Sequence, residues 1–501
     1  MEAEHILNQL NDPQKEAVTH QGGSTLVVAG AGSGKTRVLV HRIAWLIAVE
    51  SINPHAILAA TFTNKAASEM KGRIDQMLQA PTQGMWVGTF HGLAHKFLRL
   101  HWQEAGLQQD FQILDSDDQY RHIRRLLKNL NLDEAYYPPK EIQWFINNQK
   151  DLGLRFNNIK KDPTKTKHIE IYQAYEQSCE QSGFVDFGEL LFRSFETLKK
   201  NTALLDHYHN RFKHVLVDEF QDTNEIQYQW VKLISGAETS TFIVGDDDQS
   251  IYRWRGAKSE NMQRFQREFK NCRLIKLEQN YRSTKTILEA ANAIIANNKQ
   301  RLDKKLWTDG DEGSPIELIG VFDEYEESRV IVEKITSWQS SGRRLNTVAV
   351  LYRSNAQSRV IEGALLQHQI PYRVYGGLRF FDRAEIKDAL AYLRLVVNNN
   401  DDLAFERSSN MPPKGLGAKT MSQIRAFAKN HNLSLLAAAS VLVENKELAT
   451  RAHSAVRDFI ALIAKIEHAI KNLTLSDQFE TCIKMSGLIP FLKSKKTERA
   501  E

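Results

Sequence analysis

The sequence predicts an α/β protein whose parallel sheets are covered by helices. Short apolar runs typical of buried strands, at 25–29, 56–62 and 85–90, alternate with segments of helical periodicity. Each run ends in polar residues, and the first leads directly into a glycine-rich loop. With 501 residues, of which 42% are hydrophobic, the chain is long enough for three or four domains of roughly 150 residues each.

A break in the strand–helix alternation predicts how the first part of the chain is organised. From 90 to 213 the pattern is helical, with polar faces. Strand-like runs then return at 214–218, 241–245 and 273–277. We therefore predict a first α/β lobe made of 1–89 and 214–280, interrupted by a helical insert at 90–213.

The rest of the chain predicts a second, incomplete lobe. Its strand-like runs lie at 315–321, 347–352 and 372–375. We assign 281–380 to the first part of a second α/β lobe, and 381–501, which shows helical periodicity, to a helical subdomain. Because three runs cannot close a second sheet of the first lobe's size, we expect the chain to be a truncated piece of a longer parent.

Composition narrows the class of protein. The longest near-apolar run, 433–443, is shorter than the ~18 residues that span a bilayer, and the N-terminus lacks a basic-then-apolar signal. The three cysteines have no CxxC spacing, so we expect neither a disulfide framework nor a zinc site. A net charge of +5 permits a polyanionic partner without requiring one. We expect a cytoplasmic protein with no membrane association.

The segment AGAGSGKT at 29–36 predicts a phosphate-binding loop. It lies between a buried strand and a helix, where backbone N–H groups and the helix dipole can hold a triphosphate. Lys35 is placed to reach the β- and γ-phosphates, and the Thr36 hydroxyl to bind Mg²⁺. The usual motif begins with glycine, whereas this chain has Ala29, which is still small enough for a tight turn.

A pair of acids after a later strand predicts the other half of a nucleotide site. The run VLVDEFQD ends its apolar part at Asp218 and Glu219. In a P-loop sheet such residues provide a magnesium-ligating aspartate and a carboxylate that can align water. Together with the loop at 29–36, they indicate nucleotide hydrolysis that proceeds by positioning and charge stabilisation.

An ordered series of motifs carries a family resemblance over essentially the whole chain. They are LNDPQKEAV (10–18), AGAGSGKT (29–36), TFTNKAASEM (61–70), GTFHG (88–92), VDFGELL (185–191), VDEFQDTN (217–224), VGDDDQSIYRWRGA (244–257), LEQNYRST (277–284), LYRSNAQSR (351–359) and YGGLRFFDRAEIKD (375–388). The chain resembles superfamily 1 DNA helicases of the UvrD, Rep and PcrA type. The resemblance implies two RecA-like P-loop lobes, 1A and 2A, with two inserted helical subdomains, 1B and 2B.

The resemblance also implies roles in ATP binding. Gln14 would read the adenine edge, Arg37 and Tyr281 would sandwich the base, and Gln249 and Arg282 would contact the γ-phosphate. The implied catalytic residues are Lys35, Asp218, Glu219, Gln249 and Arg282. The implied ATP-binding residues are Gln14, Ala29, Gly30, Ala31, Gly32, Ser33, Gly34, Lys35, Thr36, Arg37, Tyr281 and Arg282, with Mg²⁺ held by Thr36 and Asp218.

For nucleic acid, the resemblance implies a track across both lobes on which bases stack and phosphates are held. The track residues are Phe62, Asn64, Thr89, Phe90, His91, Phe187, Tyr252, Trp254, Arg255, Arg353 and Asn355. From periodicity alone, Phe62 and Phe90 fit a hydrophobic core equally well. Arg253 stands where the family has a small residue, so the turn before Trp254 has less freedom to take a positive φ.

The segment PPKGLGAKT at 412–420 resembles a family element that grips the duplex backbone. Backbone N–H groups at Gly415 and Gly417, with Lys414 and Lys419 nearby, suit a phosphate. A glycine that only caps a helix is the alternative interpretation.

The resemblance implies an ATP-driven motor that moves 3′ to 5′ on single-stranded DNA and unwinds duplex at junctions, in repair or replication. Repair-protein partners and self-association would accompany that role. The family's later motifs, which include its arginine finger, have no match in this sequence, so an alternative is a fragment that binds ATP and DNA but hydrolyses ATP poorly. A P-loop protein unrelated to nucleic acid, such as a small-molecule kinase, leaves GTFHG and IYRWRGA unexplained.

Overall fold

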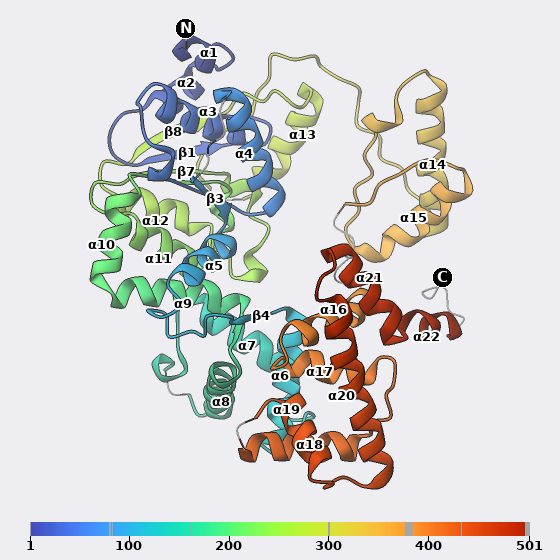
Figure 1. Ribbon diagram of the computed structural model, residues 1–501. Helices are drawn as coiled ribbons and strands as arrows, with labels where there is room; N and C mark the ends of the chain where they lie inside the picture. The colour runs from blue at the N-terminus through green and yellow to red at the C-terminus, as the bar shows by residue number, and fades with distance from the viewer. Residues whose placement is uncertain are drawn as a thin grey trace. The chain divides into compact units, whose positions relative to one another are not determined.

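The computed structural model describes residues 2–79, 82, 84–160, 162–298, 301–375, 384–431 and 433–495. By its internal contacts the chain forms two compact units, Met1–Glu317 and Leu318–Glu501 (Figure 1). The described residues of 281–317, which the sequence analysis assigned to the second lobe, therefore belong to the first unit. Most of the motif at 375–388, and the predicted boundary at 380, lie outside the described residues.

The first unit is built on a six-stranded parallel sheet (Figure 1). Its strand order is β3-β2-β6-β7-β1-β8. The strands are β1 (Thr25–Ala29), β2 (Ile57–Thr61), β3 (Trp86–Thr89), β6 (His214–Val217), β7 (Ser240–Gly245) and β8 (Arg273–Leu277). The predicted α/β class with a parallel sheet is confirmed, because all six strands arise from the apolar runs that predicted them.

Side chains alternate between the two faces of this sheet, so each face has its own hydrophobic core. Leu26 and Val28 of β1 join one core, while Val27 and Ala29 join the other. The second core is covered by α1 (Glu2–Leu7), α2 (Asp12–Thr19), α3 (Lys35–Ala48) and α4 (Asn64–Leu78). The first is covered by α5 (Phe90–Leu100), α9 (Phe187–Lys200), α10 (Thr202–Arg211), α11 (Glu225–Ile234) and α12 (Glu260–Glu268).

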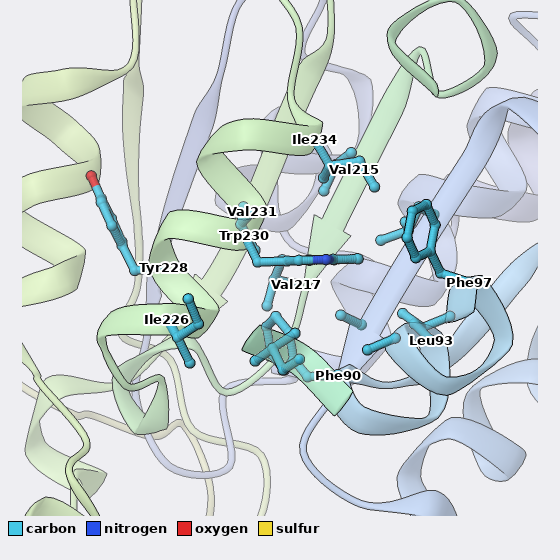
Figure 2. Close-up of a cluster of buried hydrophobic side chains, with 14 of the residues drawn as sticks. Phe90, Leu93, Phe97, Val215, Val217, Ile226, Tyr228, Trp230, Val231 and Ile234 are labelled. Atoms are coloured by element: carbon cyan, nitrogen blue, oxygen red, sulfur yellow. The ribbon is translucent and has the colours of Figure 1, made fainter. Parts of the chain in front are cut away.

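The first core is centred on the fully buried indole of Trp230 in α11. Figure 2 shows Phe90, Leu93 and Phe97 of α5 pointing toward it, with Val217 of β6 beside it. The rings of Phe90 and Trp230 meet edge to face, with centroids 6.2 Å apart. This packing fixes α5, which begins directly after β3, against the sheet.

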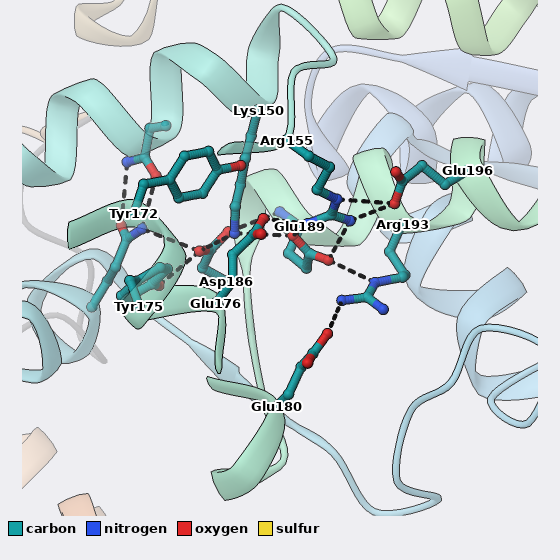
Figure 3. Close-up of polar contacts among 12 residues, drawn as sticks. Lys150, Arg155, Tyr172, Tyr175, Glu176, Glu180, Asp186, Glu189, Arg193 and Glu196 are labelled. Carbon is teal, nitrogen blue, oxygen red and sulfur yellow. Dashed lines mark hydrogen bonds and ion pairs between the residues drawn. The ribbon is translucent and has the colours of Figure 1, made fainter. Parts of the chain in front are cut away.

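The insert between β3 and β6 is mainly helical, as predicted, but it also contains a short parallel sheet. Strands β4 (Gln112–Leu114) and β5 (Phe184–Asp186) pair beside α6 (Ser116–Asn129), α7 (Pro139–Asp151) and α8 (Thr166–Ser182). Three residues are too few to show a strand period, which explains why the sequence did not predict them. A network of buried charges joins α7, α8, β5 and α9 (Figure 3).

The described part of the second unit consists of helices and the loops that join them, with no strand. One small core joins α14 (Glu324–Ser340) and α15 (Asn355–Gln367). A larger core joins helices α16 to α21, and α22 packs on α21. These helices are α16 (Ala384–Val397), α17 (Asp402–Asn410), α18 (Ala418–His431), α19 (Leu435–Glu444), α20 (Thr450–Ile470), α21 (Leu475–Ser486) and α22 (Leu488–Ser494).

The expected second sheet does not form among the described residues. The runs at 315–321, 347–352 and 372–375 form no strand. A strand exists only through hydrogen bonds to a neighbouring strand, and these runs pair with no described segment. Leu318 is accordingly 99% exposed. No helix among the described residues is both long and apolar enough to cross a membrane.

Candidate nucleotide and nucleic-acid site

A cavity of about 520 Å³ opens where the strands of the first unit end. Because the strands are parallel, the loops that follow β1, β6, β7 and β8 meet at one edge of the sheet. The cavity is lined by Ala31, Gly32, Gly34, Lys35, Thr36, Arg37, Arg73, Glu219, Gln249, Tyr281 and Arg282. Predicted ATP-site residues from four distant motifs therefore share one cavity.

The loop after β1 has the geometry of an anion cradle. Gly32 and Gly34 take φ values of 70° and 89°, a left-handed conformation that glycine adopts without strain. Gly34 is the residue before α3, so the loop leads its N–H groups into the positive end of a 14-residue helix. The hydroxyl of Ser33 donates to the Gly30 carbonyl over 2.7 Å, which closes the turn.

Charges at the base of the cavity are only partly compensated. The Nζ of Lys35 lies 3.6 Å from Glu219 Oε2, and within the described residues it finds no hydrogen-bond acceptor. The Thr36 hydroxyl lies 3.5 Å from Asp218 Oδ2, to which it donates. Burial, and then the charge of Glu219, raise the pKa of Asp218 to about 6. This set fits a magnesium-bound polyphosphate, which would supply both the missing anion and the missing cation.

Two of the residues predicted to bind adenine, Gln14 and Tyr281, contact the phosphate loop. The Gln14 side chain is 1% exposed; its Nε2 donates to Ser33 O over 2.8 Å, and its Oε1 accepts from the Asn11 backbone. Gln14 thus holds the phosphate loop from inside and is not among the described residues that line the cavity, so its contact with the adenine edge stays a prediction. The Tyr281 side chain is half-exposed, and its backbone N–H donates to Gly32 O.

Three residues that the sequence analysis did not single out belong to this site. Arg73 of α4 lines the cavity. Gln221 is fully buried and donates to Glu219 Oε2 over 2.8 Å, while its Oε1 accepts from the Asp246 backbone N–H. Asp246 also accepts from Gln249. Gln221 and Asp246 lie inside the quoted motifs, but nothing in one sequence separates them from their neighbours.

Beside the nucleotide cavity, an aromatic group marks one part of the predicted track. The rings of Phe62 and Tyr252 are stacked with centroids 5.0 Å apart, and Tyr252 is followed by Trp254 at 6.5 Å. The Arg255 guanidinium lies 4.6 Å from the centre of the Trp254 ring. Trp254 is 71% exposed, so one face of a large ring and a neighbouring cation are available to a base and a phosphate.

A second part of the track lies at the N-termini of α5 and α9. The His91 ring meets the half-exposed Phe187 ring edge to face at 6.0 Å. The Thr89 hydroxyl lies 3.4 Å from Asn64 Oδ1. Burial lowers the pKa of His91 and so disfavours the charged form of its ring. These side chains offer an aromatic edge and short polar groups.

Two expectations about the track need correction. Phe90 is 3% exposed and packs on Trp230, so no face of its ring is open to a base, and we assign it to the core. The helix is amphipathic, and position 90 falls on its buried stripe. Arg253 does not restrict its turn, because it lies in the 3₁₀ turn Arg253–Arg255 and the positive φ, 84°, falls on Gly256.

The remaining predicted residues lie in the second unit. Arg353 is exposed, and Asn355 is the first residue of α15. Gly415 takes a φ of 80°, and Gly417 directly precedes α18. The Nζ of Lys414 donates to Ser486 O over 2.7 Å, so this lysine holds the turn from inside.

Comparison with known proteins identifies the family. Residues 10–270 match the UvrD/REP helicase N-terminal domain, and residues 275–488 match the UvrD-like helicase C-terminal domain. The chain belongs to the UvrD/Rep family of helicases, as its motifs indicated, and with that family it is an enzyme of the DNA helicase and ATPase class.

Individual relatives are similar over the whole chain. It is 52% identical to DNA helicase II of Escherichia coli strain K12 over 503 residues, which cover all of this chain and 70% of that protein. It is 51% identical to DNA helicase II of Haemophilus influenzae, with the same coverage. It is 39% identical to the ATP-dependent DNA helicase PcrA of Staphylococcus aureus strain Mu50, over 86% of this chain and 59% of that protein.

Proposed function

We propose that this chain is an ATP-dependent helicase that moves 3′ to 5′ along single-stranded DNA and unwinds duplex at single-strand junctions, in DNA repair or replication. The observation that carries the proposal is that the nucleotide cavity and the exposed aromatic group of the first unit are joined by a short stretch of chain. Gln249 lines the nucleotide cavity, and Tyr252, three residues later, stacks on Phe62 of the exposed aromatic group.

The residues of the cavity have separable tasks. Lys35 and the N–H groups of the loop bind the phosphates, and Thr36 with Asp218 would hold Mg²⁺. Magnesium, when bound, offsets the negative charge that collects on the phosphate oxygens. Glu219 lies at the cavity wall, where its carboxylate can orient a water molecule and accept its proton. Gln249 and Arg282 face the same space and can respond to loss of the terminal phosphate.

Movement along DNA would follow from changes at Gln249. A shift of this side chain would move the loop that carries Tyr252 and Trp254, because Gln249 ends the short 3₁₀ turn Asp247–Gln249 that leads directly into that loop. Rings that stack on bases then change their hold on the strand once per hydrolysed ATP. The bases are gripped by their faces, so the proposal expects little sequence preference.

The test uses a duplex with one single-stranded tail. Wild-type protein with ATP should separate the strands when the tail is 3′ but not when it is 5′, and single-stranded DNA should stimulate ATP hydrolysis. A non-hydrolysable ATP analogue should support DNA binding without separation. Binding of both ligands without stimulated hydrolysis would contradict the motor and support a chain that only binds them.

Repair-protein partners, self-association and a location in the bacterial cytoplasm belong to the same proposal and rest on the family resemblance.

A further inference from the structure

The segment after α13 (Lys285–Ile295) places a buried lysine against three consecutive acids. Lys304 is 1% exposed by its side chain, and its Nζ lies 2.5–2.8 Å from carboxylate oxygens of Asp246, Asp247 and Asp248. An ammonium group has three N–H donors, so each finds one carboxylate. Burial alone would lower the pKa of Lys304, but the carboxylates, led by Asp246, outweigh it and raise that pKa.

Further contacts fix this segment at the edge of the sheet. Arg301 donates to Asp248 Oδ2 over 2.7 Å, and the Leu302 backbone N–H donates to Asp247. Two residues after Lys304, the Leu306 side chain packs against the phosphate loop. A Cβ added to Gly30 would lie 2.1 Å from Leu306 Cδ2, so this contact requires glycine in the loop.

Hydrogen bonds lead from Lys304 to the reacting part of the cavity. Asp246 is the branch point, since its Oδ2 accepts from Gln249 Nε2 and its backbone N–H donates to Gln221. Gln221 in turn donates to Glu219 Oε2. The ion pair between Lys304 and Asp246 is therefore connected by hydrogen bonds to Gln249 and to Glu219. Gln249 is proposed to face the terminal phosphate, and the Glu219 carboxylate is proposed to orient water.

The positive charge of Lys304 offsets the repulsion among the three neighbouring aspartates. Ligand oxygens of Asp246, Asp247 and Asp248 all lie within 4.8 Å of one another, which is the spacing of a cation site. Three carboxylates so close repel one another unless a cation or a proton intervenes. We propose that Lys304 is a positioning residue for ATP hydrolysis: it occupies the place of a metal ion among the three aspartates and thereby holds Gln249 and Glu219 in their working orientations. The inference rests on the proposed function and extends it to a residue outside the cavity wall.

The first test separates turnover from nucleotide binding in Lys304→Met, which keeps the length of the side chain and removes its charge. The described residues that line the cavity do not include Lys304. We therefore expect the dissociation constant of a fluorescent non-hydrolysable ATP analogue to stay nearly unchanged, while kcat at saturating single-stranded DNA falls by roughly 10- to 100-fold. A kcat close to that of wild type, or an equal loss of affinity and turnover, would overturn the proposal.

A buried lysine elsewhere provides the matched control. Lys150 is also almost fully buried between two carboxylates, those of Asp186 and Glu189, in the helical insert. Lys150→Met should lower the thermal midpoint at least as much as Lys304→Met does, yet leave kcat per folded molecule unchanged at saturating DNA. An equal loss of kcat in both variants would mean that only general stability is involved, and this would overturn the positioning role.

A second readout does not depend on hydrolysis. In nucleotide-free protein, Ca²⁺ should bind the three carboxylates once Lys304→Ala has vacated the space among them, and it should raise the thermal midpoint of that variant, with no such rise in wild type. Equal responses in the two proteins would overturn the assignment of the lysine to a cation's place. Wild type without any DNA-stimulated hydrolysis would refute the proposed function, whereas this comparison would still report on Lys304.

A third variant covers the case in which Lys304→Met does not fold. Combining it with Asp247→Asn and Asp248→Asn removes two negative charges and leaves Asp246 without its cation. This triple variant should fold, bind the ATP analogue and still show the reduced kcat. Turnover at the wild-type level in the folded triple variant would overturn the proposal.

Discussion

Two clusters of buried charge in the first unit differ in how completely their charges are paired. In the helical insert, the Arg155 guanidinium meets Glu176, Glu189 and Glu196 at 2.6–2.8 Å (Figure 3). Burial alone would raise the pKa of Glu189, but Arg155 and two further cations outweigh it and hold that pKa well below its usual range. Every charge in this cluster faces an opposite charge at hydrogen-bond distance.

The nucleotide cavity shows the opposite pattern. Its lysine, Lys35, lies 3.6 Å from the nearest carboxylate and, so far as the described residues show, lacks a hydrogen-bond acceptor. Burial and the charge of Glu219 raise the pKa of Asp218 and of Asp222 to about 6. One Asp222 oxygen is buried without a hydrogen-bond donor from any described residue.

The difference separates a cluster that supports the fold from one that binds a ligand. Buried charges cost free energy unless they are paired, so a fully paired cluster can fix the helices around it. Unpaired buried charges destabilise the ligand-free protein. A ligand with complementary charges pairs with them, and this pairing contributes to the free energy of binding. Removing a charge should therefore damage activity at the nucleotide cavity and stability in the helical insert.

The largest expected effect is on activity, from Lys35→Ala. Lys35 is the cation of the phosphate loop itself, at the first position of α3, so DNA-stimulated ATP hydrolysis should fall by at least ~10²-fold and nucleotide affinity should weaken. Because Lys35 donates no hydrogen bond to the described protein groups, the free energy of unfolding in urea should change by less than about 1 kcal/mol. Retained turnover would show that the loop is not the active site.

The largest expected effect on stability comes from Arg155→Met. The substitution removes the cation that three buried glutamates share, although Glu189 keeps its ion pairs with Lys150 and Arg193. This should cost about 3 to 5 kcal/mol of unfolding free energy. Urea unfolding measures it, and binding of an ATP analogue by the folded variant should not change. Arg124→Met is the control: its pair with Glu134 spans 3.0 Å at the surface, where the expected loss is below about 1 kcal/mol. Equal losses in the two variants would contradict the comparison.

The two clusters also differ in how far the sequence could predict them. The phosphate loop is a run of consecutive residues, and its chemistry follows from their order, so the sequence alone predicts roles for Lys35 and Thr36. Arg155 and its partners lie 21 to 41 positions apart. Each looks like an ordinary charged residue on a solvated helix face, because only folding brings them together. Lys304 escaped prediction for the same reason.

Side-chain direction was the other limit. Phe62 and Phe90 both follow strands and both carry rings, yet Phe62 stacks on Tyr252 whereas Phe90 points into the core. A motif fixes the position of a residue along the chain, and packing decides which way its side chain points. The prediction of strands at 315–321, 347–352 and 372–375 is wrong for a related reason. An extended run becomes a strand only when another segment pairs with it.

Asp151, the last residue of α7, is an acid whose ionisation should make the stability of the fold depend on pH. Its Oδ1 accepts from Asn224 over 2.8 Å, and burial, followed by the charge of Asp186, raises its pKa to about 7. Its ionised form is therefore disfavoured in the folded protein, and this cost is present above pH 7 and absent below the unfolded pKa near 4. Asp151→Asn should raise the unfolding free energy by roughly 2 to 3 kcal/mol at pH 8.

The gain from Asp151→Asn should shrink as the pH falls from 7 to 4, as measured by urea unfolding across that range. The exposed Asp206 of α10 provides the control, since Asp206→Asn should leave the pH dependence unchanged. A gain that stays constant with pH would mean that the amide acts through packing, and Asp151 would then belong with the paired charges.

The smallest expected effect tests a site that depends on neither kind of charge cluster. Trp254 presents an exposed ring, so Trp254→Ala should weaken binding of single-stranded DNA by roughly 1 to 3 kcal/mol with little sequence preference. The matched control is Trp144→Ala, because Trp144 is 66% exposed on α7 and carries no predicted role. Since tryptophan neutralises no phosphate, the slope of log affinity against log salt should be the same in Trp254→Ala and wild type. Unchanged DNA titrations would remove Trp254 from the track, and a reduced slope would mean that the loss acts through Arg255.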